Sequence, residues 1–243
     1  ISVGPPFFNK LILPFLIPFM LAMAIGPKLK WIKSDIEDKI YLISFFVISL
    51  ILSVLIIRNL DINFLYNTIL ITAAFYLFFI TLRDFFHRKY RNLSQITAHF
   101  SFSILILSIL FNNIFSSEVI TNLKINETYQ AQNLKINFES IEQENKQNFK
   151  AIKGKFIVED QSGLIEVMQP ELRIYNQPNI VTSEADIKTN IFTDKFMTMN
   201  YVQNQDYFNI RYQVKPFMIW IWISTILLCL SGCLSLIRKK YEN

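Results

Sequence analysis

The sequence is poor in charged residues, glycine, cysteine and histidine. Only 18% of its 243 residues are charged, and it contains 5 Gly, 2 Cys and 2 His. Soluble proteins carry about 25% charged residues, and disordered chains combine high charge with low hydrophobicity. This composition therefore excludes a disordered chain, a collagen and a coiled coil.

Apolar residues dominate the chain instead. They make up 52% of it, and 23 of them are Phe. They come in long uninterrupted runs, and about 20 consecutive apolar residues are enough to span a bilayer as an α-helix. We therefore expect an integral membrane protein.

The two cysteines, Cys229 and Cys233, lie four positions apart inside one apolar run. This spacing fits neither a disulfide framework nor the C-x-x-C pair of a redox or zinc site. We expect both to be small packing residues on one face of a membrane helix.

Five apolar segments are predicted to be transmembrane helices. The first contains Pro14 and Pro18, which a membrane helix tolerates where neighbouring helices cover the freed carbonyls. None of the five segments contains Asp or Glu in its interior. The predicted spans are Pro6–Ile25, Ile40–Ile57, Leu65–Leu82, Ile96–Phe115 and Pro216–Ile237.

Basic residues gather in three of the segments that adjoin these spans. By the positive-inside rule that side is the cytoplasm, or the matrix of an organelle, so the N-terminus lies outside and the C-terminus inside. The formal charge of +5 therefore reports topology and gives no support to nucleic-acid binding. The basic residues are Lys28, Lys30, Lys33, Lys39, Arg83, Arg88, Lys89, Arg91, Arg238, Lys239 and Lys240.

The predicted topology divides the chain into four parts. Residues 1–115 form a transmembrane region of four helices, and residues 116–215 form a domain on the outer side, in the periplasm or the intermembrane space. Residues 216–237 form the last helix, and residues 238–243 form a short basic tail on the inner side. The membrane is expected to be the bacterial inner membrane or the mitochondrial inner membrane.

The outer segment is predicted to be a β-rich domain. Alternating apolar residues run from Leu134 to Phe138 and from Phe208 to Val214, and the second run leads directly into the last span. Residues 155–159 and 164–168 flank a turn that ends in Gly163, which predicts a hairpin. Residues 142–150 are polar without either period, so we expect an exposed loop there.

The two histidines differ in setting. His87 lies in a basic segment and is interpreted as a solvated residue, whereas His99 lies about one turn inside the fourth span, where an ionisable side chain suggests function. A proton relay or an ion site would need acidic partners at the same depth, and the spans provide none. A hydrogen bond between helices and axial ligation of haem iron remain open.

Several segments, in the same order, resemble the CcmF-type subunit of the cytochrome c haem lyase. Residues 2–9, SVGPPFFN, resemble the family's SVGPPYFN, and residues 26–31, GPKLKW, resemble its GPLLRW. Ala98 and His99 resemble the family's membrane histidine, with Ser101 where Gly is common. In the outer domain, Tyr175, Pro178, Thr182, Glu184, Ala185, Ile187 and Asp194 match a scattered pattern, although residues 194–196 read DKF where the family often has DLY. Residues 215–222 resemble the P-x-x-x-WIW start of the last helix.

The resemblance implies that His99 is one of two axial ligands of a membrane-embedded haem b. The second ligand belongs to an upstream part of the family, so the chain looks like the C-terminal part of the subunit or one half of a split version. The implied activity is covalent attachment of haem to the C-x-x-C-H segment of apocytochrome c, with electrons drawn from quinol to reduce the incoming haem.

The implied partners are the upstream half of the subunit, a haem chaperone, apocytochrome c and the subunit that presents it. The alternative is a non-catalytic membrane scaffold that docks the same partners. The two hypotheses differ in whether His99 holds haem.

Overall fold

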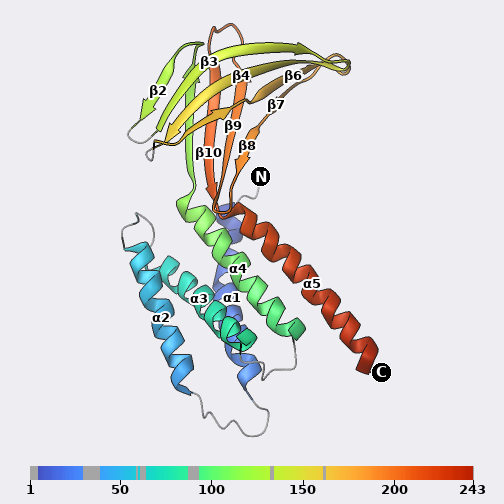
Figure 1. The fold of residues 1–243 in the computed structure, drawn as a ribbon. Helices are drawn as coiled ribbons and strands as arrows, with labels where there is room; N and C mark the ends of the chain where they lie inside the picture. The colour runs from blue at the N-terminus through green and yellow to red at the C-terminus, as the bar shows by residue number, and fades with distance from the viewer. Residues whose placement is uncertain are drawn as a thin grey trace. The chain divides into compact units, whose positions relative to one another are not determined.

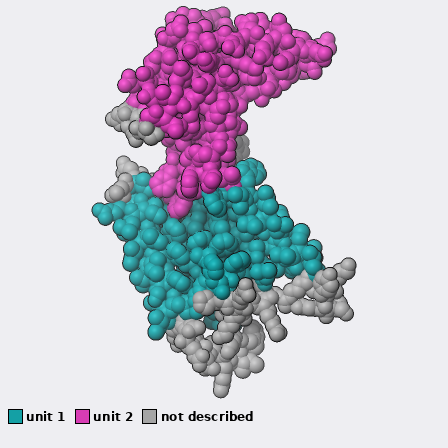
Figure 2. All heavy atoms as spheres, in the orientation of Figure 1, with its two compact units in different colours: residues 1–110, 220–243 teal, residues 111–219 magenta. Residues whose placement is uncertain are grey.

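The computed structural model describes residues 5–29, 39–58, 60, 64–86, 93–131, 134–160 and 163–242. The chain divides into two compact units, one formed by residues 1–110 and 220–243 and the other by residues 111–219 (Figure 2). The first unit is helical, and the second consists mainly of β-strands.

The helical unit is built from long apolar helices. Within the described residues, four of them, α2, α3, α4 and α5, are long and apolar enough to cross a membrane. The helix α1 has 21 residues, and its apolar stretch Pro14–Lys28 is shorter. The bounds are α1 (Pro5–Ile25), the short 3-10 helix η1 (Gly26–Lys28), α2 (Lys39–Ile57), α3 (Phe64–Phe86), α4 (Leu93–Phe115) and α5 (Met218–Glu242).

Several serine and threonine side chains in these helices donate their hydroxyls to carbonyls of the same helix. Ser53 donates to the carbonyl of Ser49 at 2.7 Å, and Thr72 donates to the carbonyl of Thr68 at 2.7 Å. In lipid, where no water is available, the backbone carbonyl serves as the hydrogen-bond acceptor of the hydroxyl. The hydroxyls therefore do not prevent these helices from lying in a bilayer.

The helix α3 is the most buried of the set, with α1 and α2 packed against it. On α2, the buried residues Ser49, Ser53 and Ile57 recur every four positions, which places them on one face. The Phe45 ring of α2 stacks on the Phe79 ring of α3 with centroids 6.1 Å apart. This face of α2 therefore combines small buried serines with an aromatic contact to α3. Small residues allow membrane helices to approach closely.

The cysteines of α5 do not fulfil the packing role predicted from the sequence. Cys229 and Cys233 are both exposed in the part of the chain that the structure describes.

The second unit is a β-sandwich of two antiparallel sheets (Figure 1). The first sheet has the strand order β1-β10-β9-β8, and the second has the order β2-β3-β4-β6-β7 with β5 paired to β4. The bounds are β1 (Ser117–Leu123), β2 (Thr128–Ala131), β3 (Leu134–Asn145), β4 (Phe149–Asp160), β5 (Ile165–Met168), β6 (Glu171–Tyr175), β7 (Val181–Glu184), β8 (Asp186–Thr189), β9 (Thr193–Tyr201) and β10 (Phe208–Pro216).

The core of the sandwich lies between the two sheets. Phe138 and Phe156 are cross-strand partners, fully buried, and their rings stack with centroids 4.3 Å apart. Met197 and Met199 of β9 and Ile210 of β10 cover them from the other sheet. These residues recur every second position, so each strand presents one apolar face, as the alternation in the sequence predicts.

One lysine lies inside the sandwich, at one end of this core. Lys195 precedes Met197 by two positions on β9, and its side chain is mostly buried. Its Nζ lies 2.7 Å from Oε2 of Glu166 on β5 and 3.6 Å from Oδ2 of Asp160 at the end of β4. The ammonium thus joins the first sheet to the β4–β5 hairpin through two carboxylates.

The predicted hairpin and the predicted last strand are confirmed. The strands β4 and β5 pair antiparallel, and Gly163 adopts φ +74° in the turn between them. The strand β10 ends at Pro216, and α5 begins at Met218.

The exposed loop predicted for residues 142–150 is wrong. The strands β3 and β4 extend through this segment and pair from Glu142 with Lys153 to Asn145 with Lys150. The polar sequence is explained by position: this end of the hairpin extends beyond the apolar core, so both of its faces meet water and no period develops.

Candidate functional site

His99 lies in the membrane helix α4, six positions after its first residue, Leu93. Its side chain is half-buried. The neighbouring Ser101 and Ser103 are fully buried, and their hydroxyls donate to the carbonyls of Thr97 and Phe100, each at 2.7 Å. These small side chains use their polar atoms within α4, so the imidazole is the polar group of this segment that extends toward other helices.

Two other helices provide the polar surroundings of the imidazole. The backbone carbonyl of Met23 in α1 accepts a hydrogen bond from His99, and the carboxylate of Asp84 in α3 acts on it electrostatically. An imidazole that donates one N–H to a carbonyl keeps its second nitrogen as an acceptor while the ring is neutral. A neutral ring that donates to the Met23 carbonyl would therefore have its other nitrogen available as an acceptor.

Asp84 belongs to a buried ion pair near the end of α3. It pairs with Lys28 of η1, and the two side chains are only 9% and 7% exposed. The third span predicted from the sequence ended at Leu82 and therefore left Asp84 out. Lys28 was assigned to the basic inner side, and no partner for it was predicted. The sequence did contain a signal for this pair: Asp84 and Lys28 carry opposite charges, and each lies just beyond the end of an apolar run.

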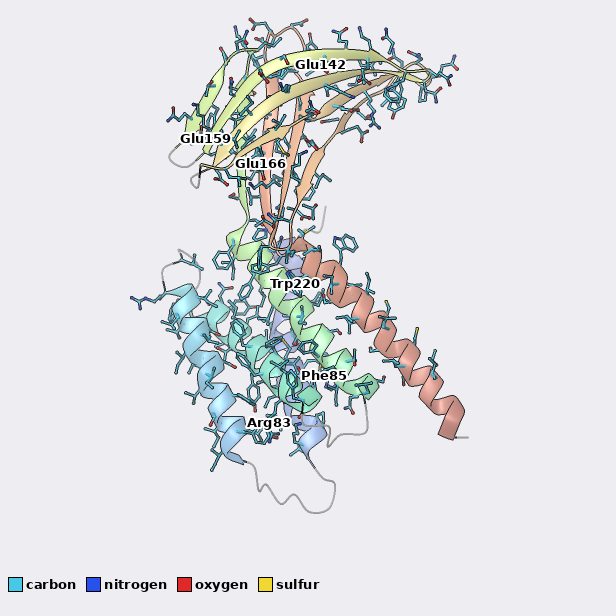
Figure 3. The ribbon with its side chains drawn as sticks, viewed as in Figure 1. Arg83, Phe85, Glu142, Glu159, Glu166 and Trp220 are labelled. Atoms are coloured by element: carbon cyan, nitrogen blue, oxygen red, sulfur yellow. The ribbon has the colours of Figure 1, made fainter. Side chains whose placement is uncertain are left out.

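Two aromatic residues, Phe100 and Phe102, follow His99 on α4. The Phe100 ring stacks on Phe78 with centroids 5.5 Å apart and on Phe85 at 6.4 Å, both from α3 (Figure 3 labels Phe85). The Phe102 ring meets Phe19 of α1 edge to face at 5.9 Å. These ring contacts join α4 to α1 and α3 next to the histidine in the sequence.

Arg83 adds a positive charge beside Asp84. Its guanidinium lies 3.7 Å from the ring centroid of Tyr41 in α2, a cation–π contact (Figure 3). The end of α3 is therefore anchored to α2 through Arg83 and to η1 through Asp84.

The residues present fit one side of a haem-ligand site. A neutral imidazole whose other nitrogen is held by a carbonyl is the usual form of a histidine ligand, and apolar aromatic surroundings suit a porphyrin. Within the described residues no group of three or more His, Cys, Asp or Glu gathers as a metal site. Among the described residues His99 is the only histidine, so a second histidine ligand would have to come from outside them. The other predicted histidine, His87, lies outside the described residues.

Together, these features define a multi-pass membrane protein that carries a β-sandwich between its last two membrane helices. Residues 114–216 match the family described as the CcmF C-terminal beta-sandwich. The resemblance to the CcmF-type subunit, predicted from the sequence motifs, is confirmed for this chain.

Curated relatives extend the similarity over the whole chain. The cytochrome c-type biogenesis protein CcmF of Haemophilus influenzae is 25% identical over 258 residues, covering 100% of this chain and 40% of the relative. CcmF of Escherichia coli is 24% identical over 253 residues, with 39% of the relative covered. The chain thus spans about two-fifths of the length of these relatives.

A solved structure shows the same fold. The structure of "Cytochrome c Heme Lyase CcmF" matches with a TM-score of 0.73 and 18% identity, over 94% of this chain and 40% of that one. The match includes both helices and sandwich, since its coverage exceeds either unit alone.

Proposed function

We propose that this chain is the C-terminal part of a haem lyase, or one half of a split haem lyase, that attaches haem to apocytochrome c, and that His99 is one axial ligand of a haem b. The observation that carries the proposal is the setting of His99: an imidazole on a membrane helix that has the backbone of Met23 as a hydrogen-bond partner and directly precedes Phe100, whose ring stacks on Phe78 of α3. The relatives named for cytochrome c biogenesis support it.

The roles of the residues follow from their positions. His99 would hold the haem iron through the ring nitrogen that does not face Met23, and the Met23 carbonyl would orient the ring. Phe100 and Phe102 keep water away from the site through their contacts with α3 and α1. The chemistry that bound haem b would supply is one-electron transfer from quinol toward the haem that is to be attached.

The remaining assignments extend this proposal. The membrane is the bacterial inner membrane or the mitochondrial inner membrane, with the N-terminus outside, the C-terminus inside and the β-sandwich on the outer side. The upstream part of the subunit contributes the second axial ligand. The haem chaperone, apocytochrome c and its presenting subunit bind the assembled lyase.

The test is the absorbance of haem b in chain co-expressed with the upstream part of the subunit. A His99→Gly variant is expected to lose at least nine-tenths of the b-type absorbance per folded protein, because the iron loses an axial ligand, and added imidazole is expected to restore part of it. His87→Gly, which removes the other histidine, is the matched control and keeps the absorbance.

The scaffold hypothesis makes the opposite prediction. If His99→Gly keeps the absorbance of the parent while remaining folded, His99 is a structural hydrogen-bond donor to Met23. The haem-ligand proposal would then be wrong, whereas the membrane fold would be unaffected.

A further inference from the structure

The turn between β8 and β9 presents two large apolar side chains on the surface of the sandwich. Ile191 is 61% exposed and Phe192 is 64% exposed. The turn is well ordered by hydrogen bonds: Oδ1 of Asn190 accepts the N–H groups of Phe192 at 2.8 Å and Thr193 at 2.7 Å. The exposure of Phe192 therefore results from a built turn that directs the ring outward.

This turn lies level with the start of a membrane helix. The carbonyl of Phe192 accepts a hydrogen bond of 2.7 Å from the N–H of Phe217, the single residue between β10 and α5. Thr193, the next residue of β9, pairs with Pro216. Because α5 begins at Met218 and is apolar from its first residue, the backbone of the turn is hydrogen-bonded to the residue that directly precedes this apolar helix.

The end of the helix α4 lies at the same level. Nδ2 of Asn112 donates to the carbonyl of Pro216 at 2.6 Å, and the rings of Phe111 and Phe217 have centroids 5.5 Å apart. After Phe115, the chain needs one residue to enter β1, whose Ser117 pairs with Val214. The last turn of α4 and the residues just before α5 thus contact each other, and the residues just before α5 are bonded to the β8–β9 turn.

We propose that the β8–β9 turn, residues 190–192, inserts the side chains of Ile191 and Phe192 into the outer headgroup and acyl boundary of the bilayer that α4 and α5 span. The turn contains no charged residue, so nothing in it opposes insertion. Aromatic side chains favour this layer of the membrane. The lipid surface is thus the third contact of this end of the sandwich, beside the two helices.

The strand β9 provides a matched control for the test. Tyr201 lies at the opposite end of β9, is 57% exposed, and is also aromatic. Tyr201 is separated from Phe192 by the length of β9, roughly 30 Å at about 3.3 Å per residue. It is in the same domain as Phe192 and similarly exposed, and it lies at the far end of the strand that leaves the turn.

The experiment measures the depth of a nitroxide at each end of β9. In the full chain with Cys229→Ser and Cys233→Ser, a spin label is attached at Phe192→Cys or at Tyr201→Cys, in nanodiscs of phosphatidylethanolamine and phosphatidylglycerol. Power saturation then compares collisions with oxygen, which concentrates in lipid, and with a water-soluble nickel chelate. We expect the oxygen-to-nickel ratio at position 192 to exceed that at position 201 several-fold.

Two results would overturn the proposal. Equal ratios at the two positions would place the turn in water, and a label at 192 shielded from both collision partners would show that protein covers it. Ile191→Cys provides a second label site if the 192 variant does not fold. The measurement does not depend on haem, so its failure leaves the proposed function of His99 untouched.

Discussion

The buried pair of Lys28 and Asp84 gives the sharpest test of how the helical unit is stabilised. The two side chains are 7% and 9% exposed, so an Asp84→Asn variant removes a carboxylate charge from opposite an ammonium that water hardly reaches. Removing one member of a buried pair costs about 3–5 kcal/mol. At about 1.4 kcal/mol per tenfold change, this corresponds to roughly a 10²–10⁴-fold shift toward the unfolded state.

The assay is the fraction of monodisperse protein that survives heating in a mild detergent, measured by size-exclusion chromatography. Asp84→Asn is expected to lower the midpoint temperature strongly. The double variant Lys28→Met and Asp84→Leu is expected to recover most of the loss, because replacing both members by apolar residues of similar volume leaves no buried charge. The effects of the two substitutions on stability should therefore be strongly non-additive.

An exposed pair of the same chemistry serves as the control. Lys124 and Asp206 lie 2.6 Å apart on the sandwich, with side chains 48% and 73% exposed. Asp206→Asn is expected to leave the midpoint temperature nearly unchanged, since water screens exposed pairs. The reasoning is refuted if Asp84→Asn is as mild as Asp206→Asn, or if the double variant is no more stable than Asp84→Asn.

Two further predictions concern the sandwich, with pulse proteolysis of the full chain in urea as the readout. An alanine at Gly154 places its Cβ 2.6 Å from the Phe156 ring and 2.9 Å from the sulfur of Met199, so we expect overpacking of roughly 1–3 kcal/mol; an unchanged urea midpoint contradicts this. Burial, ahead of nearby carboxylates such as Glu166, raises the pKa of Tyr212 above its ordinary value of 10.0. The unfolded phenol ionises above about pH 10 while the folded one stays neutral, so stability is full below that pH and falls above it. Tyr212→Phe should flatten this alkaline loss, and an equally steep loss in the variant would contradict the assignment.

Local patterns in the sequence predicted the parts of the fold that local physics determines. Alternation from Phe208 to Val214 predicted β10, and the turn ending in Gly163 predicted the β4–β5 hairpin, because a strand with one buried face shows its period in a few residues. Residues 142–150 lack that period since they extend beyond the core, so their pairing depends on the strand partner rather than on their own pattern.

The surroundings of His99 could be predicted only in part. Its place on a membrane helix follows from the apolar run around it, and the neighbouring small residues were visible in the sequence. Its contact with the Met23 carbonyl depends on how α1 packs, and no side-chain pattern reports a backbone acceptor. The pair of Lys28 and Asp84 joins residues 56 positions apart, so it needs the three-dimensional arrangement of η1 and α3.

The lysine inside the sandwich limits how its sequence can change over time. Lys195 holds Glu166 at 2.7 Å and Asp160 at 3.6 Å, and Met197 and Met199 follow it on the same strand face. A slide of β9 by two residues would bring the ammonium among apolar side chains, so the trio permits one register only. Substitutions at these three positions should therefore occur together in descendants of this chain, with the charges lost or exchanged as a set.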